Sequence, residues 1–155
     1  MRIRHPLFVG LVAAFTVSLA IVAVSAVAAQ TPFKGTVNAE ETVVPSPPTA
    51  SLTRHGTGTA TYLGRYTEHI VMTINLPMLS STGTATFTAA NGDTLTTVAG
   101  QATRTSLTTL SIVEVYTVTG GSGRFADATG NFTLHSAVDQ TTGVSSGTLS
   151  GAIDH

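Results

Sequence analysis

The chain has 155 residues, of which 10% are charged and none is cysteine, and its formal net charge at pH 7 is −1. Its seven basic residues are too few and too scattered for the clustered Lys and Arg of a nucleic-acid-binding surface. The lack of cysteine excludes disulfides and thiol chemistry, and a domain of this size can be held together by one hydrophobic core instead.

Residues 1–29 have the form of a secretory signal peptide. Arg2 and Arg4 precede an apolar run from Leu7 to Val24, and small residues at 27–29 stand where a signal peptidase would cut. We therefore predict that the segment is removed and that the protein is secreted or periplasmic. The apolar run approaches the ~20 residues that span a bilayer, so an uncleaved anchor is the alternative. No later run is long and apolar enough to predict a membrane-spanning helix.

Residues 30–50 are predicted to form an N-terminal strand and a proline-rich connector. A short strand is expected over residues 33–38, and Pro45-Ser46-Pro47-Pro48 follows it. Proline cannot donate a backbone hydrogen bond and fixes φ, which predicts an extended loop or tether here. We place the barrel domain at residues 51–155.

Short runs of alternating apolar and polar residues fill that domain. This period of two is typical of half-buried β-strands, and no stretch has a convincing helical period. The pair Asn91-Gly92 predicts a two-residue hairpin turn of the primed type. Strands are expected within residues 57–62, 68–76, 84–89, 94–102, 110–119, 132–138 and 144–153.

About eight strands with short connections predict an antiparallel meander that closes on itself. Closure removes the unpaired edges that an open sheet would leave. Small residues such as Gly58, Ala85 and Gly147 suit a narrow interior, and threonines such as Thr84 and Thr86 are expected to face water. The predicted fold class is all-β, a single eight-stranded antiparallel β-barrel.

A glycine-rich segment between the sixth and seventh expected strands predicts a tight structural turn. Glycine reaches positive φ without a Cβ clash, and phenylalanines are available to fix the turn to the core. The segment also fits a relaxed GxGxxA pattern, but a dinucleotide site needs a helix after it, and a strand is expected there. The turn residues are Gly120, Gly121, Gly123, Arg124, Phe125 and Gly130.

Three segments, Ala89–Leu95, Val118–Phe125 and Ala128–Phe132, resemble the allene oxide cyclase barrel-like proteins and their relatives the dirigent proteins. In that family a GGTGRFAGATG-type segment precedes a late strand. The resemblance implies a calycin-type barrel with a largely apolar lumen, and a homo-oligomer. Enzymes of the family cyclise an unsaturated fatty-acid epoxide, whereas dirigent proteins steer radical coupling in plants.

Two glutamates, Glu68 and Glu114, have the parity of the apolar residues on their strands, so both are expected on the inner face. Burial would raise the pKa of such a carboxylate and suit it to general acid or base catalysis. A position at the barrel rim, or an ion pair with Arg65 or Arg104, is the alternative.

Four histidines, His55, His69, His135 and His155, lack the spacing that places two metal ligands on one face of one element. We therefore predict solvated surface histidines, with no metal and no cofactor.

Two functions are compatible with these patterns. The first is an exported barrel that holds a small apolar molecule in its lumen or serves as a structural envelope module. The second, which the family resemblance implies, is an isomerase or cyclase acting on an unsaturated lipid, with Glu114 or Glu68 transferring a proton. The predicted ligand-binding side chains are Tyr62, Met72, Phe87, Tyr116 and Leu134.

Overall fold

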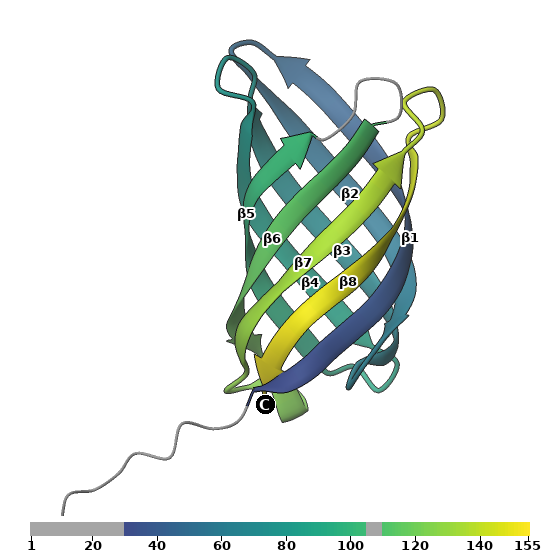
Figure 1. Ribbon diagram of the computed structural model, residues 1–155, viewed down its shortest axis with the longest axis vertical. Helices are drawn as coiled ribbons and strands as arrows, with labels where there is room; N and C mark the ends of the chain where they lie inside the picture. The colour runs from purple at the N-terminus through teal and green to yellow at the C-terminus, as the bar shows by residue number, and fades with distance from the viewer. Residues whose placement is uncertain (1–29, 105–109) are drawn as a thin grey trace, which may run out of the picture.

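The computed structural model describes residues 30–104 and 110–155, so the predicted signal peptide lies outside the described residues. The described chain is all-β and forms a closed antiparallel barrel whose strands follow one another in sequence order (Figure 1). This confirms the predicted fold class. The strands are β1 (Thr31–Ser46), β2 (Thr49–Ala60), β3 (Gly64–Asn75), β4 (Ser80–Ala89), β5 (Thr94–Arg104), β6 (Leu110–Gly121), β7 (Thr129–Val138) and β8 (Val144–Asp154).

The first residues of β1 and the last residues of β8 lie at the lower end of the barrel in Figure 1. The β1–β2, β3–β4 and β7–β8 turns lie at the upper end. Within the described part of the chain, no helix is long and apolar enough to cross a membrane.

The division at residue 51 was wrong, because residues 30–50 supply the first strand and the first turn of the barrel. β1 pairs with β2 from Gly35 to Ser46, but its register with β8 ends at Glu40. Proline is tolerated in a strand where its nitrogen meets no ladder acceptor, as at a sheet edge. Pro45 lies in the part of β1 that extends beyond β8, which explains how a proline-rich sequence joins the barrel.

The β4–β5 turn also differs from our prediction. Gly92 has a φ of +89°, but Asn91 is not among the described residues with positive φ, which excludes a type I′ turn. Residues 90–93 connect the strands instead. The side-chain oxygen of Asn91 accepts a hydrogen bond from the Asp93 N–H at 3.1 Å, and this bond stabilises the longer turn.

The corner between β6 and β7 has the form that the glycines predicted. A short 3₁₀-helix, η1 (Gly123–Phe125), buries Phe125 fully at the lower end of the barrel, and the guanidinium of Arg124 lies 5.0 Å from the centroid of that ring. β7 follows η1 directly, so the GxGxxA pattern lacks the α-helix that a dinucleotide site requires. Three glycines of the corner have positive φ: Gly120 (+118°), Gly123 (+59°) and Gly130 (+129°).

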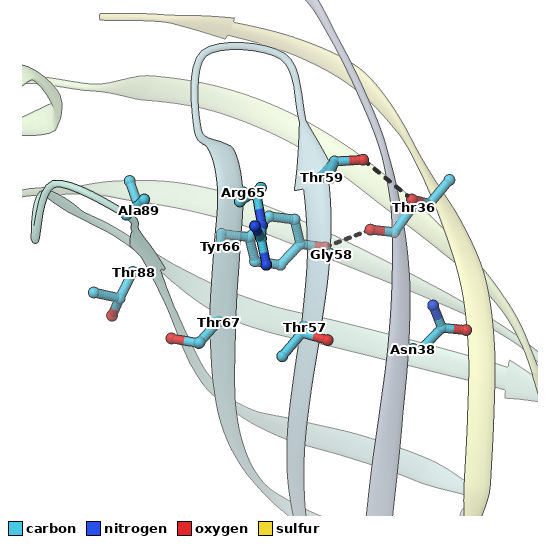
Figure 2. Close-up of a pocket in the computed structure, with 11 residues that line it drawn as sticks. Thr36, Asn38, Thr57, Gly58, Thr59, Arg65, Tyr66, Thr67, Thr88 and Ala89 are labelled. Atoms are coloured by element: carbon cyan, nitrogen blue, oxygen red, sulfur yellow. Dashed lines mark hydrogen bonds between the residues drawn. The ribbon is translucent and has the colours of Figure 1, made fainter.

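Inward glycines make room for large side chains of the neighbouring strand. Gly58 on β2 is paired with Tyr66 on β3. The Tyr66 ring extends across Gly58 toward β1, where its hydroxyl donates a hydrogen bond to the backbone oxygen of Thr36 at 3.0 Å (Figure 2). A Cβ at position 58 would lie 2.0 Å from that oxygen and 2.7 Å from the Tyr66 ring.

Gly58→Ala should therefore lower the free energy of unfolding by about 1–3 kcal/mol, the usual cost of overpacking a filled core. Gly100→Ala is the matched control, since the nearest described atom to a Cβ there would be the Val115 backbone oxygen at 3.5 Å, and the change should stay within about 0.5 kcal/mol. Urea unfolding followed by circular dichroism measures both. Equal stability of the two variants would contradict the packing of Tyr66 against Gly58.

Candidate functional site

Arg54 on β2 lies inside the barrel, with only 1% of its surface exposed. Its Nε donates a hydrogen bond to Glu68 Oε1 at 3.1 Å, and its Nη2 donates to Glu114 Oε2 at 2.8 Å. Nη1 lies 3.4 Å from Glu41 Oε1, and Nη2 also contacts the Tyr116 hydroxyl at 2.6 Å. The same hydroxyl donates to Glu114 Oε2 at 2.5 Å. We call these five residues the Arg54 cluster.

The alternation of the strands brings this cluster together. Arg54 occupies an inward position of β2, and the next inward position, Gly56, is paired with Glu68 on β3. A Cβ at Gly56 would lie 2.9 Å from the Glu68 side chain, so the absence of a side chain there makes room for the carboxylate. Glu114 and Tyr116 occupy successive inward positions of β6.

The Arg54 cluster contains more negative than positive groups. Among the inward side chains that the structure describes, three carboxylates surround one guanidinium. Burial raises the pKa of Glu68 to about 7, and the nearby Arg54 only partly opposes this shift. Burial also disfavours the charged guanidinium, but interactions with Tyr116, Glu114 and Glu68 outweigh it and raise the pKa of Arg54. Arg54 therefore stays charged.

Tyr116, in the Arg54 cluster, and the nearby Tyr66 are both neutral. Burial raises the pKa of Tyr116 well above its usual value, and burial followed by the charge of Glu68 raises the pKa of Tyr66. The Tyr116 hydroxyl consequently serves as a hydrogen-bond donor to Glu114.

Several buried polar atoms face the lumen without a hydrogen bond to any described residue. They come from four strands and occupy inward positions of the alternation. Buried polar atoms of folded proteins normally bond to protein, water or ligand. The atoms are Glu68 Oε2, Ser81 Oγ, Thr97 Oγ1 and Ser136 Oγ.

The lumen below the Arg54 cluster is filled by aromatic rings. Phe132 is the centre of this packing, with ring centroids 4.9 Å from Phe33, 5.1 Å from Tyr116 and 5.6 Å from Phe87. Tyr66 adds an edge contact to Phe87 at 5.6 Å. These rings leave the lower half of the barrel as an ordinary packed core.

Six small side chains lie among the larger apolar ones at the described inward positions at and above the level of Arg54. The strand register determines which residues lie at the same height in the barrel. A path that starts at Glu41 and follows paired residues across all eight strands returns to β1 at Thr31, ten residues closer to the lower end, so residues of one height are offset along successive strands. The larger apolar residues there are Leu52, Met72, Ile74, Leu110, Ile112 and Val138. The small residues are Ala39, Ala50, Ser81, Gly83, Ser136 and Ser145.

The prediction that Glu68 and Glu114 point inward is confirmed, and both are paired with Arg54 rather than with Arg65. Arg65 lies on the outer face of β3, and the side chain of Arg104 lies outside the described side chains. Sequence reasoning missed Arg54 and Glu41. Arg54 alternates in phase with Leu52 and Gly56, so extending the predicted strand to residues before 57 would have placed it on the inner face.

Four of the five predicted ligand-binding residues, Met72, Phe87, Tyr116 and Leu134, are buried inside the barrel. Tyr62 lies apart from these four, although it packs against the hydrophobic core. This residue lies in the β2–β3 turn with a φ of +66°, and its ring packs 4.3 Å from that of His155 at the lower end.

The outer face carries a depression of about 520 Å³ above β1, β2, β3 and β4 (Figure 2). Hydroxyls of Thr36 and Thr59 lie 3.4 Å apart at its edge. The buried Tyr66 contributes to its lining, and Arg65 lies beside it. No member of the Arg54 cluster lines this depression, which therefore differs from the interior site.

His55 and His69 face outward from β2 and β3, and their rings stack 4.6 Å apart. His135 also faces outward, from β7. Within residues 30–104 and 110–155, no group of three His, Cys, Asp or Glu side chains is arranged to hold a metal ion.

No family model, no curated protein and no solved structure matches this chain. The resemblance to the allene oxide cyclase barrel-like proteins therefore remains a prediction.

Proposed function

We propose that the barrel binds a small, largely apolar molecule in the upper half of its lumen. The contrast between the two halves of the lumen carries this proposal. Aromatic rings fill the lower half, whereas small residues and aliphatic side chains such as the flexible Met72 surround the upper half, where the buried Ser81 and Ser136 hydroxyls have no partner among the described residues. Barrels of eight strands are wide enough to hold one small ligand.

The rim of the upper end supports the same role. Val43 on β1 is 49% exposed, and Val144 at the start of β8 is equally exposed. In the β3–β4 turn, Met78 is 74% and Leu79 is 79% exposed. Clusters of exposed apolar side chains commonly mark sites of ligand or partner binding. An apolar molecule would thus meet a compatible surface before it enters the lumen. Binding of this kind suits the exported protein that residues 1–29 predict.

Fluorescence titration with N-phenyl-1-naphthylamine, a neutral apolar probe, tests the proposal. We expect a saturable rise in emission with the wild-type protein. Ser81→Leu should abolish it, because Ser81 is an inward residue of the upper half and its hydroxyl has no described partner to lose. Thr82→Leu is the matched control, since the adjacent residue faces outward and should leave binding intact.

Circular dichroism establishes that both leucine variants are folded. Absence of saturable binding to wild type, or equal binding by the two folded variants, would contradict a site in the lumen. Native mass spectrometry of the protein purified from its own source then identifies any natural ligand by its mass.

An isomerase or cyclase acting on an unsaturated lipid is the second candidate. It is supported by the pKa of Glu68, which burial raises to about 7, close to the ideal for proton transfer at neutral pH. Incubation with a racemic unsaturated fatty-acid epoxide, followed by chiral chromatography, tests it. Enantiomerically enriched product from wild type and racemic product from Glu68→Gln would support catalysis, and racemic product from both would contradict it.

A further inference from the structure

We infer that the molecule held in the lumen carries a protonated amine, bound by the carboxylates of Glu41 and Glu68. This inference rests on the proposed function and adds the chemical class of the ligand.

The hydrogen bonds of the Arg54 cluster are unevenly shared. Glu114 receives short bonds from both Arg54 and Tyr116. Among the described residues, the Glu41 carboxylate has one contact, at 3.4 Å with the guanidinium, and Glu68 Oε2 accepts no hydrogen bond. An ionised carboxylate offers about four lone-pair sites, so the unused acceptor capacity of the cluster lies on Glu41 and Glu68.

The charge of the cluster favours a cation. Three carboxylates against one guanidinium leave an excess of negative charge in surroundings from which water is largely excluded. A buried charge without a partner is costly, and a cation that enters the site would offset this cost. The same excess would repel a fatty-acid carboxylate or another anion.

Side chains near Glu68 suit an organic ammonium group. Phe87 is paired with Glu68 across the β3–β4 ladder, and Tyr66 and Tyr116 form edge contacts with Phe87 at 5.6 Å and 6.1 Å. The faces of such rings attract cations.

The path to the carboxylates starts at the upper rim. Glu41 occupies the inward position of β1 directly below Val43, which is half exposed at that rim. The Glu41 side chain is itself only 5% exposed. An amine that enters between the apolar rim residues would therefore reach Glu41 first, with its apolar tail toward Leu52 and Met72.

Isothermal titration with three probes of equal chain length, octylamine, octan-1-ol and octanoate, at about pH 8 tests the inference. The amine is protonated and Glu68 is ionised at this pH. Octylamine should bind about ten-fold more tightly than octan-1-ol, the gain expected from a charge-assisted hydrogen bond, and octanoate should bind most weakly.

Glu41→Gln and Glu68→Gln should each reduce the preference for octylamine over octan-1-ol. Glu40→Gln is the matched control, because it removes the same charge from the adjacent residue on the outer face and should leave the preference unchanged. The preference is a ratio measured within one variant, so a general loss of stability does not imitate the effect.

The outcomes separate the two proposals. If octan-1-ol and octylamine bind equally to wild type and Ser81→Leu abolishes both, the amine inference is wrong and lumen binding stands. If neither probe binds to the folded wild-type protein, both proposals are wrong. Equal amine preference in Glu40→Gln and in the two interior variants would also overturn the assignment to Glu41 and Glu68.

Discussion

Replacing Arg54 with methionine should lower the free energy of unfolding by about 3–5 kcal/mol, the range measured when one partner of a buried ion pair is removed. Methionine retains much of the packing volume but leaves Glu68 and Glu114 buried without a countercharge. Urea unfolding followed by circular dichroism measures the loss. Arg65→Met is the control, since this guanidinium is exposed on the outer face and should contribute within about 0.5 kcal/mol.

Neutralising the carboxylates should restore much of that stability. The triple variant Arg54→Met, Glu68→Gln, Glu114→Gln also removes the two carboxylates that accept the shortest carboxylate hydrogen bonds of Arg54. Replacement of a whole buried ion pair is often neutral, whereas removal of one partner is not. If Arg54→Met alone unfolds at the same urea concentration as Arg65→Met, the Arg54 cluster does not hold the barrel together.

Glu68 should make the stability of the barrel depend on pH between about 4.5 and about 7. Burial raises the pKa of this carboxyl from 4.5 to about 7, so the folded protein holds the proton more tightly than the unfolded chain. The contribution of Glu68 is therefore complete below about pH 4.5 and is lost as the pH rises through 7. Its full size is on the order of 3 kcal/mol.

The difference in unfolding free energy between wild type and Glu68→Gln isolates this effect. The other groups around Glu68, namely Arg54, Glu41, Glu114, Tyr66 and Tyr116, are present in both proteins. The stability of wild type relative to the variant should fall as the pH rises from 4.5 to 7 and then level off. A difference that is constant across this range, or that grows with pH, would contradict a raised pKa in the folded state.

The sequence was sufficient to predict the barrel because threonine recurs at the outward positions of its strands. Thr84, Thr86 and Thr88 alternate with Ala85 and Phe87, and the structure places the threonines outside and the other two residues inside. A period of two repeated along the chain with short connections leaves few other folds that bury the apolar face. The glycine corner was predictable for a similar reason, since positive φ restricts the residue type.

The Arg54 cluster could be predicted only in part. Parity placed Glu68 and Glu114 inside, but their meeting depends on the stagger of the barrel, which brings β1, β2, β3 and β6 to one level in the lumen. Alternation along one strand carries no information on this stagger. Charged residues are usually exposed, so the alternation pattern alone did not predict an arginine at an inward position.

The seam between β1 and β8 has a consequence for folding kinetics. It is joined by Thr31 and Ile153, whose hydrogen bond links positions 122 residues apart. Because the ribosome makes β8 after β1 to β7, the seam cannot form until β8 has been made, and the entropic cost of closing so long a loop must be met before the contacts form. We expect refolding on the scale of milliseconds to seconds, typical of proteins rich in non-local strand pairs.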